Sequence, residues 1–167
     1  MAEILSPRIF NDPGLTFSSA GTHGLHGYAI SRQAERLLQR NHISQMTIDA
    51  FRSRRLTAVI ASKADLILCF EHHQRTHIVV ESPLKARRTF LLNDFANLCE
   101  AARQRGLITG DAVEDRLLGV ADIAPLLRTS VPASSDIADP QGGDMEAYLT
   151  AHNETVRALK RIAAAVV

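Results

Sequence analysis

Residues 64–70 of the chain read Ala64-Asp65-Leu66-Ile67-Leu68-Cys69-Phe70. Apart from Asp65, every side chain in this run is apolar. A short, continuous apolar run is typical of a strand that is buried on both faces, as in a parallel sheet. The run therefore predicts a parallel sheet that is covered by helices on both sides.

Helical patterns flank this strand. On its N-terminal side the sequence predicts a helix that is capped by Ser31 and ends near Asn41, then a second helix over 48–62. On its C-terminal side a helix is predicted over 72–80. Pro83 follows it, and a proline restricts the residue before it to non-helical conformations.

The rest of the chain continues the alternation of strands and helices. Residues 89–92 are a second strand candidate, and Asn93 is predicted to cap a helix over 94–105. A further helix is expected over 112–127. Upstream of all of these, residues 15–19 are predicted to form a short strand that runs into a glycine-rich turn.

The last helix has the clearest pattern. Asp144 is its predicted cap, after a polar loop over 129–143. Its apolar stripe, at spacings of three and four, consists of Tyr148, Leu149, His152, Val156, Leu159, Ala163 and Val166. Taken together, the elements predict an α/β three-layer sandwich with a short parallel sheet, in a single domain over residues 1–167.

Bulk composition excludes several functions. The net charge of +1 provides no electrostatic footprint for nucleic acid or an anionic membrane. No run reaches the roughly 18 apolar residues of a membrane span, and the first residues do not form a signal peptide, so we expect a cytoplasmic protein. Two cysteines do not make a disulfide framework, and seven histidines without metal-ligand spacing predict no metal and no cofactor.

Four segments, in order, resemble the low-molecular-weight protein tyrosine phosphatases. Residues 1–5 (Met-Ala-Glu-Ile-Leu) are similar to the helix that follows the Cys-x5-Arg-Ser-Pro loop of that family. Residues 17–22 (Phe-Ser-Ser-Ala-Gly-Thr) resemble its SAGT strand end, and residues 64–68 its ADLIL strand. Residues 136–140 (Asp-Ile-Ala-Asp-Pro) resemble its late Asp-Pro loop. The resemblance covers most of the chain and implies the fold of that family.

The family's nucleophile loop is missing from the sequence. In the family, a first strand and the Cys-x5-Arg loop come before the segment that resembles Met1–Leu5. The cysteine thiolate attacks phosphorus, and the loop amides cradle the phosphate oxygens. We therefore expect an N-terminally truncated and inactive chain whose sheet lacks its first central strand. A start codon assigned too late, a fragmentary gene and a naturally shortened relative all remain open.

A second Cys-x5-Arg pattern runs from Cys69 to Arg75. A phosphate cradle needs successive N–H groups to converge, which usually takes glycine or asparagine, and residues 70–74 contain neither. Glu71 would also place a negative charge beside the phosphate. We therefore expect Cys69 to be a small buried apolar residue at a strand end.

The resemblance implies two site residues. Asp139 matches the family's general acid, which protonates the leaving oxygen and later activates water, and Pro140 keeps it outside any helix. Ser19 matches the serine whose hydroxyl supports the nucleophile loop. Each residue also has a purely structural alternative. Asp139 would then belong to a simple Asp-Pro turn, and the Ser19 hydroxyl would only satisfy local backbone groups. Where many members carry two tyrosines after Asp-Pro, residues 141–143 are Gln-Gly-Gly, which removes an aromatic wall and resembles relatives that act on phosphoarginine.

The expected partner is a phosphorylated protein or a small phosphoester. The leading hypothesis is that the intact parent is a phosphatase with a cysteine nucleophile and an aspartic general acid. The alternatives are a non-catalytic phosphate-binding or interaction module on the same scaffold, a protein-arginine phosphatase, and an arsenate reductase relative.

Overall fold

The computed structural model describes residues 1–24 and 26–167. At its centre, β1 (Ile67–Cys69) runs parallel to β2 (Thr89–Leu91), with Leu68 opposite Phe90. In the described part of the chain the sheet has these two strands only. The predicted strand over 64–70 is therefore confirmed at its centre, and the parallel sheet is confirmed in a shorter form.

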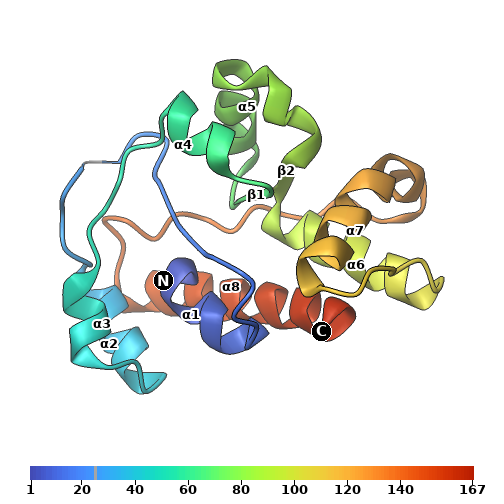
Figure 1. Cartoon of the computed structure of the whole chain (residues 1–167). Coiled ribbons are helices and arrows are strands. Elements are labelled where there is room, and N and C mark those ends of the chain that lie inside the picture. The colour runs from blue at the N-terminus through green and yellow to red at the C-terminus, as the bar shows by residue number, and fades with distance from the viewer. Residues whose placement is uncertain (25) are drawn as a thin grey trace.

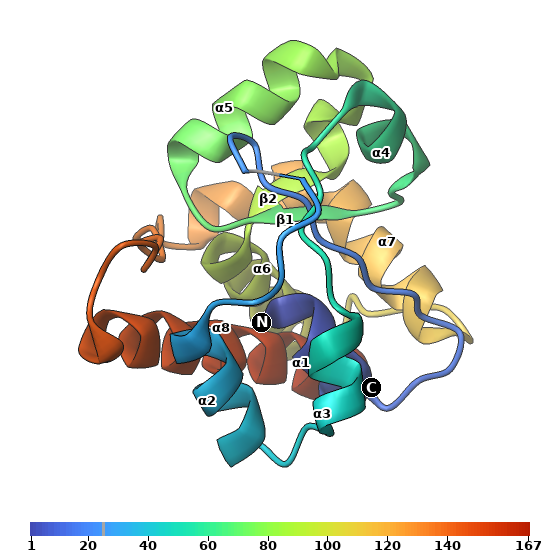
Figure 2. The ribbon, with the colours of Figure 1, turned by 90° about the vertical axis from the view of Figure 1, so that its left-hand side faces the viewer.

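Helices cover both faces of this short sheet (Figures 1 and 2). On one side lie α4 (Ala58–Lys63), α5 (His72–Glu81) and the 3-10 helix η1 (Pro83–Arg88). On the other side α6 (Leu92–Gln104) packs against the sheet, and α8 (Met145–Val166) packs beneath α6.

The remaining helices complete the lower layer and its flank. α1 (Ala2–Phe10) packs beside α8, and α2 (Arg32–Arg40) contacts both α8 and α3 (Gln45–Ala50). α7 (Val113–Leu127) packs against α6, and the 3-10 turn η2 (Arg128–Ser130) follows it directly.

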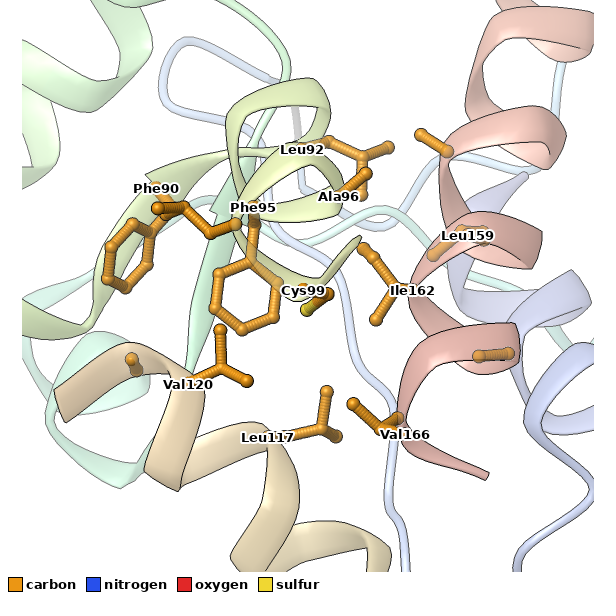
Figure 3. Packing of buried hydrophobic residues seen from close by; sticks show 14 of the residues in the cluster. Phe90, Leu92, Phe95, Ala96, Cys99, Leu117, Val120, Leu159, Ile162 and Val166 are labelled. Atoms are coloured by element: carbon orange, nitrogen blue, oxygen red, sulfur yellow. The ribbon is translucent and has the colours of Figure 1, made fainter. Parts of the chain in front are cut away.

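The main core lies between α6, α7 and α8 (Figure 3). Phe95 and Cys99 of α6 and Ile162 of α8 are completely buried. Phe90 of β2 contacts Phe95, with ring centroids 5.2 Å apart. The sheet therefore rests on the same core as the terminal helix, which explains how so small a sheet is held in place.

Two predicted helix caps are confirmed. The Ser31 hydroxyl accepts a hydrogen bond from the Ala34 amide, and the Asp144 carboxylate accepts one from the Ala147 amide. Each bond satisfies an amide that has no partner inside the first turn of the helix. Along α8, most of the predicted stripe is buried, whereas Leu149 is 38% exposed.

The predicted strand over 15–19 is wrong. Phe17 packs on Phe10 of α1, with ring centroids 5.4 Å apart, and the Ser19 amide donates to the Glu3 carboxylate. The segment is thus held by side chains of α1 and pairs with neither strand of the sheet.

Two further predictions need correction. The helix predicted over 48–62 is two short helices, because residues 51–57 are extended and bond to an earlier loop: the Gly21 amide donates to the Arg54 carbonyl. Asn93 does not cap α6, which already begins at Leu92. Its side-chain amide donates instead to the Ser135 carbonyl.

As for the membrane, every helix within the described ranges is too short or too polar to cross a bilayer.

Candidate active site at the carboxyl end of the sheet

The loop that carries Asp139 is attached where β1 ends and α5 begins. The Ile137 amide donates to the Phe70 carbonyl over 2.9 Å, and the Ile137 side chain is buried. The Asp136 carboxylate accepts from the His72 amide at 3.1 Å and lies 2.5 Å from Nδ1 of the same residue. Ligands of open α/β folds collect at this end of the strands, so the loop is anchored at the expected edge.

Asp139 itself is exposed and lies outside any helix. Its carboxylate accepts a hydrogen bond of 2.9 Å from the Gln141 amide, and the Pro140 carbonyl accepts one from Gly143. These bonds form a compact turn that holds the carboxylate at the surface.

Ser19 is bonded to the first turn of α1. Both its amide and its hydroxyl donate to Glu3 Oε2, over 2.9 and 2.6 Å. Arg54 Nη2 reaches both oxygens of the same carboxylate at 3.2 Å. The sequence reasoning missed Glu3 and Arg54. An acid in a first helical turn is so common that nothing marks this one.

Cys69 and Arg75 form no phosphate cradle. Cys69 is buried, and its Sγ donates to the Phe90 carbonyl at 3.2 Å. Burial raises the pKa of its thiol to about 11, although Arg75 opposes the shift. Arg75 Nε is engaged by the Thr89 carbonyl at 3.1 Å. The prediction that Cys69 is a small buried residue at a strand end is confirmed.

Two ionisable groups near the start of α1 are held in a poorly solvated environment. Burial lowers the pKa of the Met1 amino group. His152 of α8 is buried, and its pKa is lowered by burial first and by the Met1 ammonium second. Its Nε2 lies 3.1 Å from the Asn41 side-chain nitrogen, while its Nδ1 has no hydrogen-bond partner among the described residues. Such orphans are rare in folded proteins.

Two grooves open elsewhere on the surface. One, of about 480 Å³, lies along α6 and α8 and is bordered by Arg103, Arg157 and Lys160. The other, of about 560 Å³, lies between α1 and α3. Neither is lined by Ser19 or Asp139. Among the described residues, no group of three or more His, Cys, Asp and Glu side chains is placed to hold a metal ion.

Comparison with known proteins identifies relatives of this chain. The family model of the low molecular weight phosphotyrosine protein phosphatases matches residues 1–105. A low molecular weight protein-tyrosine-phosphatase, Ptp, of Acinetobacter johnsonii is 35% identical over 92 residues, which are 55% of this chain and 61% of that protein. A probable phosphatase of the same type, EpsP, of Ralstonia nicotianae is 30% identical over 118 residues, 70% of this chain and 79% of that protein.

Solved structures share the fold. The YwlE arginine phosphatase of Geobacillus stearothermophilus superimposes with a TM-score of 0.68 at 24% identity, covering 98% of this chain and 80% of that one. The tyrosine phosphatase Wzb of Escherichia coli K30, solved with sulphate, gives 0.68 at 20% identity, with 98% and 85% covered. An α/β fold with a short parallel sheet is thus common to all three. By the match of its sequence, the chain belongs to the low molecular weight phosphotyrosine protein phosphatase family.

Proposed function

We propose that these 167 residues are the part of a low-molecular-weight phosphatase that follows the nucleophile loop, and that this loop joins the chain directly ahead of Met1. In that intact protein a cysteine thiolate takes the phosphoryl group, and Asp139 protonates the leaving oxygen. The 167 residues alone turn over no phosphoester, because thiolate and converging amides both stabilise the transition state.

The observation that carries this proposal is the environment of Met1. Burial of an ammonium group is unfavourable, and burial lowers the pKa of the Met1 amino group, although the Glu3 carboxylate opposes the shift. A peptide bond at the same place has no charge. The Met1 ammonium also contributes to lowering the pKa of His152, so an uncharged peptide bond at this position would remove that repulsion. A preceding segment therefore relieves the unfavourable burial of the Met1 ammonium.

The free edge of β1 also supports the proposal. On the side away from β2, β1 has no strand partner in the part of the chain that the structure describes. Leu15 and Phe17 pack against the same core as Leu66 and Leu68. A strand that entered between these two segments would pair with β1 and cover apolar side chains from both.

Ser19 suits a supporting role. Its hydroxyl hydrogen is donated to Glu3, so the lone pairs of its oxygen remain available to a donor on the added loop. Because Arg54 also binds Glu3, the serine is held by a fixed carboxylate. Glu3 and Arg54 are therefore proposed to position Ser19.

A second candidate concerns the substrate. Residues 141–143 place no aromatic ring after Asp139, and Gly142 has a φ of 81°, a conformation that favours glycine. Without an aromatic wall the site has no platform for the ring of phosphotyrosine. We therefore favour a phosphoarginine side chain of a cytoplasmic protein as the substrate.

The acid role is tested in a chimera. The N-terminal residues of the Acinetobacter johnsonii phosphatase, up to the position that corresponds to Met1, are fused ahead of Met1, and kcat is measured with phenyl phosphate. Asp139→Asn should lower kcat by about 10²–10⁴-fold, the usual contribution of a general acid. The loss should be smaller with p-nitrophenyl phosphate, whose better leaving group needs less protonation.

Asp65→Asn is the matched control, since Asp65 is exposed and precedes β1. Equal kcat values for the Asp139→Asn and Asp65→Asn chimeras would refute the acid role. The same chimera, given phosphoarginine and phosphotyrosine peptides, decides between the two substrate classes by the ratio of kcat/KM.

A further inference from the structure

Two histidine rings from distant parts of the chain meet beside the candidate site, and a third histidine lies one helical turn away from one of them. His73 and His77 are four residues apart on α5, so they project from the same face of the helix. His23, in the loop after Ser19, places its ring against His77, with centroids 5.3 Å apart and planes inclined by 45°.

In two of these rings Nδ1 already faces an oxygen. Nδ1 of His23 lies within hydrogen-bond distance of Thr22 Oγ1, at 3.2 Å, whereas Nδ1 of His73 makes a longer contact of 3.7 Å with Glu71 Oε2. Within residues 1–24 and 26–167 no partner is recorded for Nε2 of either ring. Histidines that bind metals usually give their other ring N–H to such an oxygen, which fixes the ring and its tautomer.

The spacing of the His23 and His77 rings suits a shared metal ion. Zinc binds imidazole nitrogen at about 2.0–2.1 Å with tetrahedral angles, which separates the centroids of two coordinated rings by about 5 Å. His23 and His77 are already at this separation. The side chain of His73 is 63% exposed and has room to turn toward them.

We propose that His23 and His77 bind a divalent transition-metal ion, Zn²⁺ in the first place, with His73 as third ligand after a change of rotamer. Water completes the coordination. Imidazole ligands favour Zn²⁺, Ni²⁺ and Cu²⁺ over Mg²⁺ and Ca²⁺, which prefer oxygen. The ion would fasten residues 20–24 to α5, the helix whose start also anchors the Asp136 loop through His72.

This proposal replaces the expectation of no metal. That expectation rested on ligand spacing along the sequence, and His73 and His77 alone do not make a site. The ligand that completes the pair is about fifty residues away and is brought to α5 only by the fold. The competing explanation is plain stacking of two imidazoles, which predicts no metal binding.

Calorimetric titration of the 167-residue chain with ZnCl₂ tests the proposal, with MgCl₂ as the comparison. We expect saturable binding of one Zn²⁺, no binding of Mg²⁺, and a higher Tm in the presence of Zn²⁺, because a ligand of the native state stabilises it. His77→Gln and His23→Gln should each raise the Kd by about tenfold or more. Thr22→Val, which removes only the oxygen beside His23, should weaken binding in the same direction.

His42→Asn is the control, because His42 is exposed, lies in the α2–α3 connection, and has a positive φ that asparagine tolerates. An unchanged Kd in His77→Gln and His23→Gln, or an equal weakening in His42→Asn, would show an adventitious ion only and overturn the proposal. If His77→Gln does not fold, His73→Gln provides the same comparison at an exposed position.

Discussion

At the scale of single residues, burial decides which groups take part in chemistry. Cys69 has an arginine six positions later, as the family's nucleophile does, but its thiol lies in β1 and bonds to the Phe90 carbonyl. Burial raises the pKa of the Cys99 thiol as well, to about 12. Since the thiolate is the nucleophile, neither group is reactive at neutral pH.

We therefore expect both thiols of the native chain to resist iodoacetamide at pH 7.5. Alkylation should become fast only after unfolding in urea, when the pKa of each thiol returns to its ordinary value. Mass spectrometry of the labelled peptides distinguishes the two cysteines. Rapid labelling of Cys69 in the folded chain would show that its thiol is exposed and activated.

His152 makes the stability depend on pH. Burial lowers its pKa in the folded chain, so the unfolded chain takes up the proton more readily. Stability should be complete above the ordinary histidine pKa of about 6.5 and should fall as the pH decreases from there. The slope contributed by one histidine is at most about 1.4 kcal/mol per pH unit. Urea unfolding between pH 8 and pH 5 measures it.

His152→Gln should remove this contribution, since glutamine can still accept from Asn41 and does not titrate in this range. If His152→Gln leaves the slope unaltered, the pH dependence arises from other groups.

At the scale of elements, α5 is the shared support of the site. Its first residue holds the Asp136 carboxylate, and its second turn contacts the loop that follows Ser19. Side chains of α5 therefore connect two segments that are more than one hundred residues apart in the sequence. The loop over 136–144 owes its position to these few bonds.

Asp136→Asn should loosen that loop with little effect on the whole fold. The His72–Asp136 pair is mostly exposed, so its loss should cost less than about 1 kcal/mol of unfolding free energy. The Ile137 amide, which donates to Phe70, should exchange faster with deuterium. Unchanged exchange at Ile137 would mean that its buried side chain alone anchors the loop.

At the scale of the whole molecule, sequence patterns predicted the elements whose partners are local. The Asp144 cap, the stripe along α8 and the apolar run of β1 were sufficient for the fold class. The segment over 15–19 was misassigned because its apolar residues pack on α1 and the core, which an alternation pattern cannot distinguish from a strand.

The candidate site was predicted only in part, for the same reason. Asp139 and Ser19 followed from a resemblance of short motifs, and Pro140 places Asp139 outside a helix. The bonds of Ser19 to Glu3 and of Glu3 to Arg54 cross long sequence separations. No local pattern records them, because the fold alone brings these side chains together.

The most direct test of the central claim is the hydrolysis of p-nitrophenyl phosphate by the chain alone and by the chimera that carries a Cys-x5-Arg-Ser-Pro loop ahead of Met1. We expect no turnover by the 167-residue chain above that of its Cys69→Ser variant, and turnover by the chimera that disappears when the added cysteine is replaced by serine. Turnover by the chain alone that is lost with Cys69→Ser would contradict the account, and so would a folded but inactive chimera.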